Sequence, residues 1–96
     1  MIKTQLELGG KDPIYVADDV DVKAAAAAVA DGAFYNTGQS CCSVERVYVH
    51  ERLYDKFVEG AVAAVKGYVL DDPLSEAATL GPMAATRFAD VVRDHI

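Results

Sequence analysis

The sequence predicts a protein of the α/β class, a βαβ unit followed by further helices. Two short runs rich in β-branched and aromatic residues, 14–17 and 44–50, have the composition of strands. Small apolar residues recur at helical spacing between these runs, and a longer helical pattern follows the second run. A strand, a helix and a strand in this order form a parallel pair with a crossover helix. Because a sheet normally has four or more strands, we expect this unit to be part of a larger parallel-sheet domain.

The first strand follows a glycine turn over residues 7–12. Gly9, Gly10 and Pro13 exclude a helix there, whereas the residues from Ile14 onward favour a strand. Asp residues at 18, 19 and 21 then begin a helix, because carboxylates stabilise the positive end of the helix dipole. That helix ends at Asn36-Thr37-Gly38, where a residue able to adopt positive φ is available. Its inward face is made of small residues that permit close packing on a sheet: Val22, Ala25, Ala26, Val29 and Ala33.

The second strand, 44–50, is almost continuously apolar, which is typical of a strand buried on both faces. A second long helix follows, and its periodic apolar positions run from Leu53 to Tyr68. A loop over residues 69–83 with two prolines separates it from a third helix. The third helix is predicted to start near Ala84, with Val91 and Val92 pointing inward.

The composition disfavours several classes of partner. The 96 residues carry a formal net charge of −6 and no cluster of Lys and Arg, so we expect neither nucleic acid nor a membrane surface as a partner. No apolar run approaches the roughly 20 residues that span a bilayer. The first ten residues also lack the apolar core of a secretory signal. Two adjacent cysteines would close almost no loop as a disulfide, so a reducing, cytoplasmic setting fits best.

The adjacent cysteines, Cys41 and Cys42, are the first candidates for a chemical role. They follow Gly38 and Gln39 in a tight turn, where converging backbone N–H groups favour a thiolate. Cysteine is also a small hydrophobe that is often buried, so the residue type alone leaves a nucleophile and a packing role open. A metal site is the weaker alternative, because no further Cys or His pair stands at ligand spacing.

Glu7 is the second candidate. It precedes Gly9 and Gly10, whose missing side chains allow a ligand or another backbone to come close. Taken alone, Glu7 is more simply interpreted as a solvated carboxylate beside a turn. The run Gly9-Gly10-Lys11 is no phosphate loop, because it lacks the wider glycine spacing and the Ser or Thr of that motif, and it precedes a strand.

Two motifs together resemble a known enzyme family. LELGGKDP (6–13) resembles the glutamate motif of the NAD(P)-dependent aldehyde dehydrogenase superfamily, and FYNTGQSCCSVER (34–46) resembles its cysteine motif, in which Gly-Gln-x-Cys is followed five residues later by Arg. The separation of 34 residues from Glu7 to Cys41 also matches the family. The resemblance continues through the next helix and a Gly-Pro turn, and so covers nearly the whole chain. One departure is Ser43, where family members more often carry Ala or Gly; it adds a hydroxyl near the nucleophile.

The resemblance implies roles for individual residues. Cys41, and not Cys42, is the nucleophile that forms a thiohemiacetal with an aldehyde substrate. After hydride transfer to NAD or NADP, the thioester on Cys41 is hydrolysed to a carboxylic acid with Glu7 as the general base. The backbone N–H of Cys41 is one oxyanion-hole donor. Leu8 and Gly9 line the nicotinamide side of the cofactor through their backbones.

Two neighbouring residues receive lesser roles from the same resemblance. Cys42 packs beside the nucleophile, or forms a reversible oxidised pair with it. Arg46 lies on the second strand and is expected to be paired, in a structural and not a catalytic role.

The resemblance also limits what the chain is expected to do by itself. Residues 1–96 correspond to the N-terminal part of the catalytic, cysteine-bearing domain. The dinucleotide-binding domain, the asparagine of the oxyanion hole and a Glu-x-Phe-Gly-Pro segment have no counterpart in the sequence. We therefore expect neither tight binding of NAD or NADP nor dehydrogenase activity from the isolated chain. Three alternatives follow: a piece that works with the remainder of an enzyme, an inactive truncated remnant that folds by self-association as a homo-oligomer, or residual ester hydrolysis without NAD.

Overall fold

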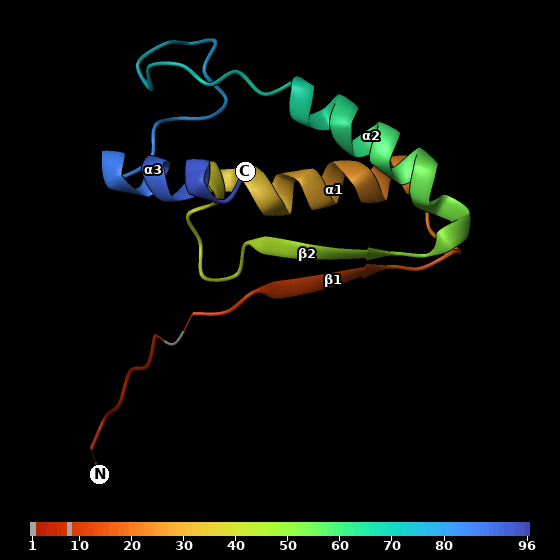
Figure 1. Cartoon of the computed structure of the whole chain (residues 1–96), viewed down its shortest axis with the longest axis horizontal. Coiled ribbons are helices and arrows are strands. Elements are labelled where there is room, and N and C mark those ends of the chain that lie inside the picture. Colours follow the sequence, from red (N-terminus) through yellow and green to blue (C-terminus); the bar gives the residue numbers. More distant parts are fainter. Residues whose placement is uncertain (1, 8) are drawn as a thin grey trace.

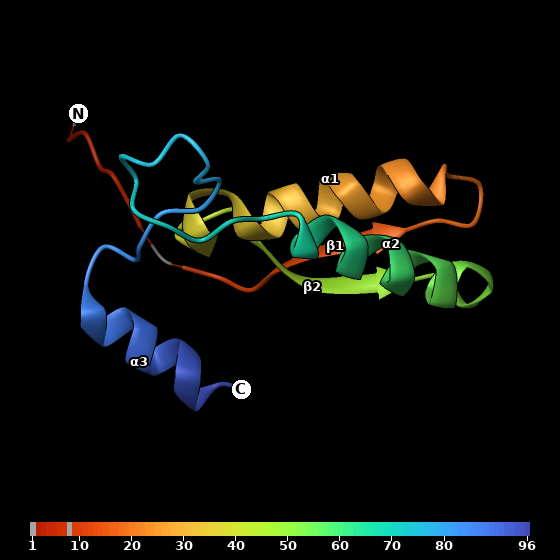
Figure 2. The ribbon, with the colours of Figure 1, turned by 90° about the horizontal axis from the view of Figure 1, so that it is seen from above.

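The computed structural model describes residues 2–7 and 9–96, and it contains the predicted parallel βαβ unit. Two parallel strands are joined by a crossover helix, and the first two long helices lie on the same side of the sheet (Figure 1). The third helix lies apart from them, at the end of a long loop (Figure 2). In chain order the elements are β1 (Asp12–Val16), α1 (Val22–Phe34), the 3₁₀ turn η1 (Tyr35–Gly38), β2 (Val44–Val49), the 3₁₀ turn η2 (Glu51–Leu53), α2 (Tyr54–Lys66) and α3 (Thr86–Asp94).

The two strands pair regularly except at one point near the start of β1. Asp12 lies opposite Val44 and Pro13 lies opposite Arg46, so Glu45 has no partner residue in β1. Proline has no N–H to donate to a ladder, and within sheets it is found near the first residue of a strand or at an irregularity of this kind. At this irregularity Glu45 and Arg46 both contact Lys11, the residue that precedes β1.

A small apolar core lies where α1, α2 and the sheet meet. Val16, Ala26, Val29 and Phe57 are buried there, and Phe57 is only 5% exposed. The two helices approach most closely at Gly60, where an added Cβ would lie 3.0 Å from the Cβ of Ala26. We predicted that the small-residue face of α1 packs on the sheet. It also packs against α2.

The helix α1 begins directly after the predicted acidic run, and of its three Asp residues Asp21 is the N-cap. The side chain of Asp21 accepts hydrogen bonds from the N–H groups of Lys23 at 2.9 Å and Ala24 at 3.1 Å. These contacts satisfy two of the N–H groups that have no partner within the first turn of a helix.

Two predictions of burial are wrong. Most of β2 is exposed, with Tyr48 at 55%, because the described residues cover only one face of the sheet. In α3, Val91 and Val92 are 50% and 43% exposed, because that helix lies away from the core (Figure 2). The radius of gyration is 15.9 Å, against the roughly 12–13 Å expected of a compact domain of this length. The chain therefore exposes apolar surface that compact domains normally cover.

Candidate active site

The cysteine loop, defined here as residues 35–43, joins the end of α1 to the start of β2. Its first part has left-handed backbone: φ is 49° at Asn36, 59° at Thr37 and 73° at Gly38. Positive φ was predicted at this position. Glycine adopts it freely, but a β-branched residue such as Thr37 does so at a cost of about 1–3 kcal/mol. Contacts with neighbouring segments must offset this cost.

Those contacts tie the cysteine loop to the segment that precedes α3. Thr37 Oγ1 donates to the Gly81 carbonyl at 2.9 Å, and the N–H of Ala84 donates to Gln39 Oε1 at 2.8 Å. Gln39 also donates from Nε2 to the Asn36 carbonyl at 3.0 Å. Sequence reasoning gave Thr37 and the Gln39 side chain no role. The partners of Gln39 include one 45 residues away, so no local pattern could have identified that contact.

Both cysteines are exposed, so the packing role predicted for Cys42 is wrong. The Cys42 Sγ lies 3.2 Å from Tyr35 Oη and 3.4 Å from Ser40 Oγ, and the two hydroxyl groups also contact each other. Hydrogen bonds from Ser40 and then Tyr35 lower the pKa of the Cys42 thiol, because they stabilise its thiolate. The pKa of Tyr35 is raised in turn, chiefly by its hydrogen bond to Cys42. Neither hydroxyl makes a hydrogen bond to Cys41 in the part of the chain described.

Cys41 lies in a turn that leaves its backbone N–H available. The N–H of Ser43 donates to the Ser40 carbonyl at 3.2 Å, and the N–H of Cys42 donates to Ser40 Oγ at 3.4 Å. Within residues 2–7 and 9–96, the N–H of Cys41 donates no hydrogen bond. An unused N–H next to an exposed thiol is suited to bind an oxyanion formed at that thiol.

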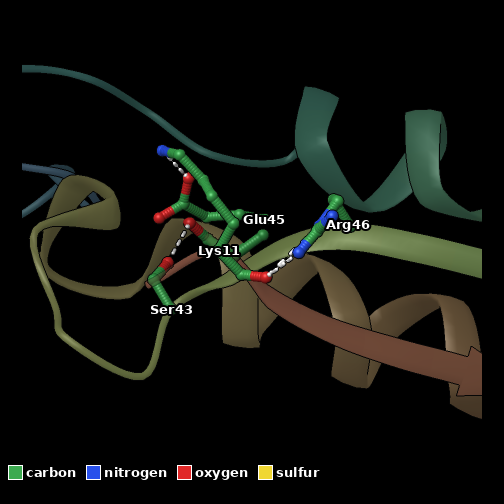
Figure 3. Close-up of polar contacts among 5 residues, drawn as sticks. Lys11, Ser43, Glu45 and Arg46 are labelled. Carbon is green, nitrogen blue, oxygen red and sulfur yellow. Dashed lines mark hydrogen bonds and ion pairs between the residues drawn. The ribbon is translucent and has the colours of Figure 1, made fainter. Parts of the chain in front are cut away.

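Ser43 anchors the end of the loop. It is 3% exposed, and its hydroxyl donates to the carbonyl of Ala33 at 3.1 Å and more weakly to that of Gly32 at 3.4 Å. The hydroxyl that we expected near the nucleophile is therefore bound to the last turn of α1, where carbonyl groups lack helical partners. Figure 3 shows Ser43 in this position beside the start of β2.

The structure does not bring the two predicted catalytic side chains into contact. Glu7 is exposed and precedes β1 outside any helix or strand; across the described ranges, no hydrogen bond or ion pair joins it to Cys41. Leu8, predicted on the cofactor side, lies outside the described residues. Gly9 has a φ of 68°, and a Cβ built on it would meet no atom within 4 Å. The described residues therefore leave the surroundings of Gly9 open.

The segment that carries Glu7 is fastened to β2 at Lys11. The guanidinium of Arg46 donates to the Lys11 carbonyl from Nη2 at 2.9 Å and from Nε at 3.3 Å. The Lys11 ammonium forms an ion pair with the Glu45 carboxylate (Figure 3). Arg46 is thus paired as predicted, but its partner is a backbone carbonyl. Because the Lys11 ammonium is already paired and the surroundings of Gly9 are open, these residues by themselves do not fit a dinucleotide cofactor.

A cavity of about 540 Å³ lies away from both cysteines, between the loop before α3 and the cysteine loop. Its lining includes Leu70, Pro82 and Met83 with Thr37, but neither Cys41 nor Glu7. In the described part of the chain, no three His, Cys, Asp or Glu side chains gather as metal ligands. A search of the same residues finds no helix long and apolar enough to cross a membrane.

Comparison with known proteins matches the whole chain to one family. The family model described as "Aldehyde dehydrogenase family" matches residues 1–96. The alpha-ketoglutaric semialdehyde dehydrogenase of Bacillus subtilis (strain 168) is 44% identical over 88 residues, which are 92% of this chain and 18% of that protein. The betaine aldehyde dehydrogenase of Brucella anthropi is 42% identical over 91 residues, 95% of this chain and 19% of that protein. The chain thus spans about a fifth of the length of these curated relatives.

Solved structures share the fold. The aldehyde dehydrogenase KauB from Pseudomonas aeruginosa superposes with a TM-score of 0.85 at 34% identity, over 93% of this chain and 18% of that one. A mutant of aldehyde dehydrogenase C from Pseudomonas syringae, complexed with NAD+ and octanal, gives a TM-score of 0.81 at 32% identity, over 88% of this chain and 18% of that one. The predicted α/β fold is confirmed by these similarities.

Proposed function

The chain belongs to the aldehyde dehydrogenase family, and on that premise we propose that it carries the two reacting side chains of an aldehyde oxidation, Cys41 as the nucleophile and Glu7 as the general base. In this proposal residues 1–96 are part of the catalytic, cysteine-bearing domain. The observation that carries it is the exposed Cys41 thiol, which lies in the family's motif beside an unused backbone N–H.

The first step is the addition of Cys41 to the aldehyde. The thiolate sulfur bonds to the carbonyl carbon, and the electron pair of the C=O bond moves to the oxygen. The N–H of Cys41 donates to this developing oxyanion, a type of contact worth about 3 kcal/mol of barrier in other enzymes. The product is a thiohemiacetal on Cys41.

Oxidation of that adduct to a thioester requires a hydride acceptor. NAD or NADP supplies this chemistry when bound, and solved relatives carry one or the other: the Pseudomonas syringae enzyme is complexed with NAD+, and a glyceraldehyde-3-phosphate dehydrogenase from Bacillus halodurans with NADP. The residues described do not form a dinucleotide site. The proposal therefore assigns only the sulfur and carboxylate chemistry to this chain.

Glu7 acts in the last step, the hydrolysis of the thioester. Its carboxylate takes a proton from a water molecule, the water oxygen attacks the thioester carbon, and the C–S bond breaks to release the carboxylic acid and free Cys41. Gly9 and Gly10 follow Glu7 and allow its segment the freedom to turn toward the cysteine loop.

Ester hydrolysis tests this chemistry without a hydride acceptor. With p-nitrophenyl acetate we expect a burst of one p-nitrophenolate per chain as Cys41 is acylated, followed by slower turnover. Cys41→Ala should remove the burst, whereas the matched variant Cys42→Ala should retain it. Glu7→Gln should keep the burst and slow turnover by about 10²–10⁴-fold, the usual contribution of a general base.

The same assay can contradict the assignment. A burst that survives Cys41→Ala and is lost in Cys42→Ala would transfer the nucleophilic role to Cys42, whose thiol pKa is lowered by Ser40 and Tyr35. Turnover that is unchanged in Glu7→Gln would remove Glu7 from the mechanism.

A second candidate, self-association or docking on the remainder of an enzyme, is favoured by the exposed apolar surface. Tyr15 and Tyr48 on the strands are 64% and 55% exposed, and Val62 on α2 is 46% exposed. We propose that this surface is covered in a homo-oligomer or by further parts of an aldehyde dehydrogenase, in a reducing compartment such as the cytoplasm, where the exposed thiols stay free. Size-exclusion chromatography with light scattering tests this, and a compact monomer would contradict self-association.

A further inference from the structure

Lys11 is held by two consecutive residues of β2, one through its side chain and one through its backbone. Glu45 pairs with the Lys11 ammonium, and Arg46 places two N–H groups on the Lys11 carbonyl (Figure 3). Successive residues of a regular strand point to opposite faces, so they seldom meet the same neighbour. Here they do so because the ladder is irregular: Pro13 lies opposite Arg46, and Glu45 has no partner residue in β1.

This contact lies midway between the two proposed reacting residues. Glu7 is four residues before Lys11 (11 − 7), and Cys41 is four residues before Glu45 (45 − 41). Measured through Glu45, the two reacting residues are therefore eight residues apart (4 + 4), and through Arg46 nine (4 + 5), against 34 along the chain. The terminal pair of the ladder, Asp12 with Val44, gives the same short path of eight residues (5 + 3). Beyond the irregular point, the pair Pro13–Arg46 gives a path of eleven residues (6 + 5), and the pair Ile14–Val47 gives one of thirteen (7 + 6).

We propose that Arg46 is a positioning residue, which holds the Lys11 carbonyl and thereby keeps the segment carrying Glu7 close to the cysteine loop. The reason for positioning Glu7 rests on the proposed function, whereas the contacts of Arg46 with Lys11 do not depend on it. Arg46 contributes more than Glu45, because the Lys11 and Glu45 side chains are 65% and 37% exposed, and exposed ion pairs contribute little. The paired N–H groups of Arg46 fix both the distance and the direction of the Lys11 carbonyl.

Thiol exchange measures this positioning without any ester, aldehyde or cofactor. The chain with Glu7→Cys and Cys42→Ala keeps two thiols, the Glu7→Cys thiol and Cys41, and is equilibrated with reduced and oxidised glutathione. The fraction that forms the internal disulfide gives the effective concentration of one thiol at the other. Without the Arg46 contact we expect the terminal Asp12–Val44 pair to open, which lengthens the path from eight to thirteen residues and lowers that concentration about twofold by loop closure alone. We therefore expect Arg46→Met, which keeps the stem and removes the donors, to lower it by about twofold or more.

Matched variants separate positioning from a general loss of structure. Arg46→Lys, which has no planar pair of N–H groups, should give an intermediate value. Glu45→Gln should give a smaller decrease than Arg46→Met. Arg93→Ala, which removes an equal charge from the distant α3, should leave the effective concentration unchanged. Circular dichroism tests whether each variant keeps its helices. If Arg46→Met loses helical structure, the effective concentration in Arg46→Lys is used in its place to test the positioning role.

The outcomes distinguish this inference from the proposed function. An effective concentration that is equal in the parent, Arg46→Met and Arg46→Lys overturns the positioning role, whatever the ester assay shows. A decrease in the Arg46 variants supports it even if Glu7→Gln leaves ester turnover unchanged, in which case only the catalytic role of Glu7 fails. Where ester turnover does depend on Glu7, Arg46→Met should slow turnover while keeping the burst, and should add nothing in the Glu7→Gln background.

Discussion

The helical body, defined here as α1 and α2 with the two strands, and the cysteine loop are held by different kinds of interaction. In the body, Phe57 and Ala26 are buried where α1 meets α2 above the sheet, and Gly60 allows the two helices to approach. In the loop, the backbone has positive φ from Asn36 to Gly38, and the contacts that hold it are hydrogen bonds. The stability of the helical body therefore depends on side-chain volume, whereas the conformation of the cysteine loop depends on hydrogen-bond donors and acceptors.

This difference separates stability from reactivity along the chain. The body depends on apolar contacts, which have little sensitivity to pH. The loop presents two exposed thiols, and Ser40 and Tyr35 act directly on one of them. A substitution in the body should therefore affect the whole fold, and a substitution in the loop should affect the thiols with the fold intact.

The largest effect is expected from Phe57→Ala, which removes the largest side chain of the core. Phe57 is 5% exposed, and truncating a buried phenylalanine to alanine typically costs about 3–5 kcal/mol. That loss is comparable to the whole stability of a small domain, so cooperative unfolding should disappear. Urea unfolding followed by circular dichroism measures the change.

Phe88→Ala is the matched control, because Phe88 on α3 is 40% exposed. It should change the free energy of unfolding by less than about 1 kcal/mol, as surface substitutions usually do. Equal losses from the two phenylalanines would mean that the body is not held by the core around Phe57.

A smaller effect is expected from Gly60→Ala. The added Cβ would lie 3.0 Å from the Cβ of Ala26, closer than carbon atoms pack, so α1 and α2 must separate. Overpacking of this kind costs about 1–3 kcal/mol, and the better helix propensity of alanine returns up to about 1 kcal/mol. Urea unfolding should therefore show a net loss. Gly81→Ala, whose Cβ would meet no atom within 4 Å, should change little, and a stabilised Gly60→Ala variant would contradict the close helix contact.

The sequence predicted the body better than the loop, for physical reasons. Periodic apolar residues and an acidic helix start act locally, so α1, α2 and the place where α1 begins could be predicted from the sequence, although the N-cap hydrogen bonds of Asp21 were not. The burial of β2 and of Val91 was overestimated. Apolar runs predict that other elements pack over them, and the described residues do not supply those elements.

The candidate site was predicted in its residue types but not in its contacts. The two sequence motifs and their spacing identified Cys41 and Glu7, and positive φ was expected at Gly38. The pairing of Gln39 with Ala84 and of Arg46 with Lys11 joins residues 45 and 35 positions apart. Such contacts depend on how the elements pack, so no single stretch of sequence encodes them.

The smallest effect concerns the pH at which Cys42 becomes reactive. Ser40 and Tyr35 lower the pKa of the Cys42 thiol, so its thiolate should form at lower pH than that of an unperturbed thiol. In a Cys41→Ala background, where Cys42 is the remaining thiol, the rate of iodoacetamide alkylation against pH gives the midpoint. Ser40→Ala should move this midpoint upward, and Tyr35→Phe should move it upward by less, because each removes a donor that stabilises the thiolate.

The sign of that shift tests whether the loop acts through hydrogen bonds. Removing a donor raises the pKa, so at a fixed pH below the midpoint both variants should be alkylated more slowly than the parent. Tyr48→Phe, which removes an exposed hydroxyl from β2, should leave the midpoint unchanged. Urea unfolding of Tyr35→Phe should stay close to that of the parent, in contrast with Phe57→Ala. A midpoint that falls in Ser40→Ala would mean that the loop hydroxyls do not stabilise the thiolate, and that the contrast between the body and the loop has another cause.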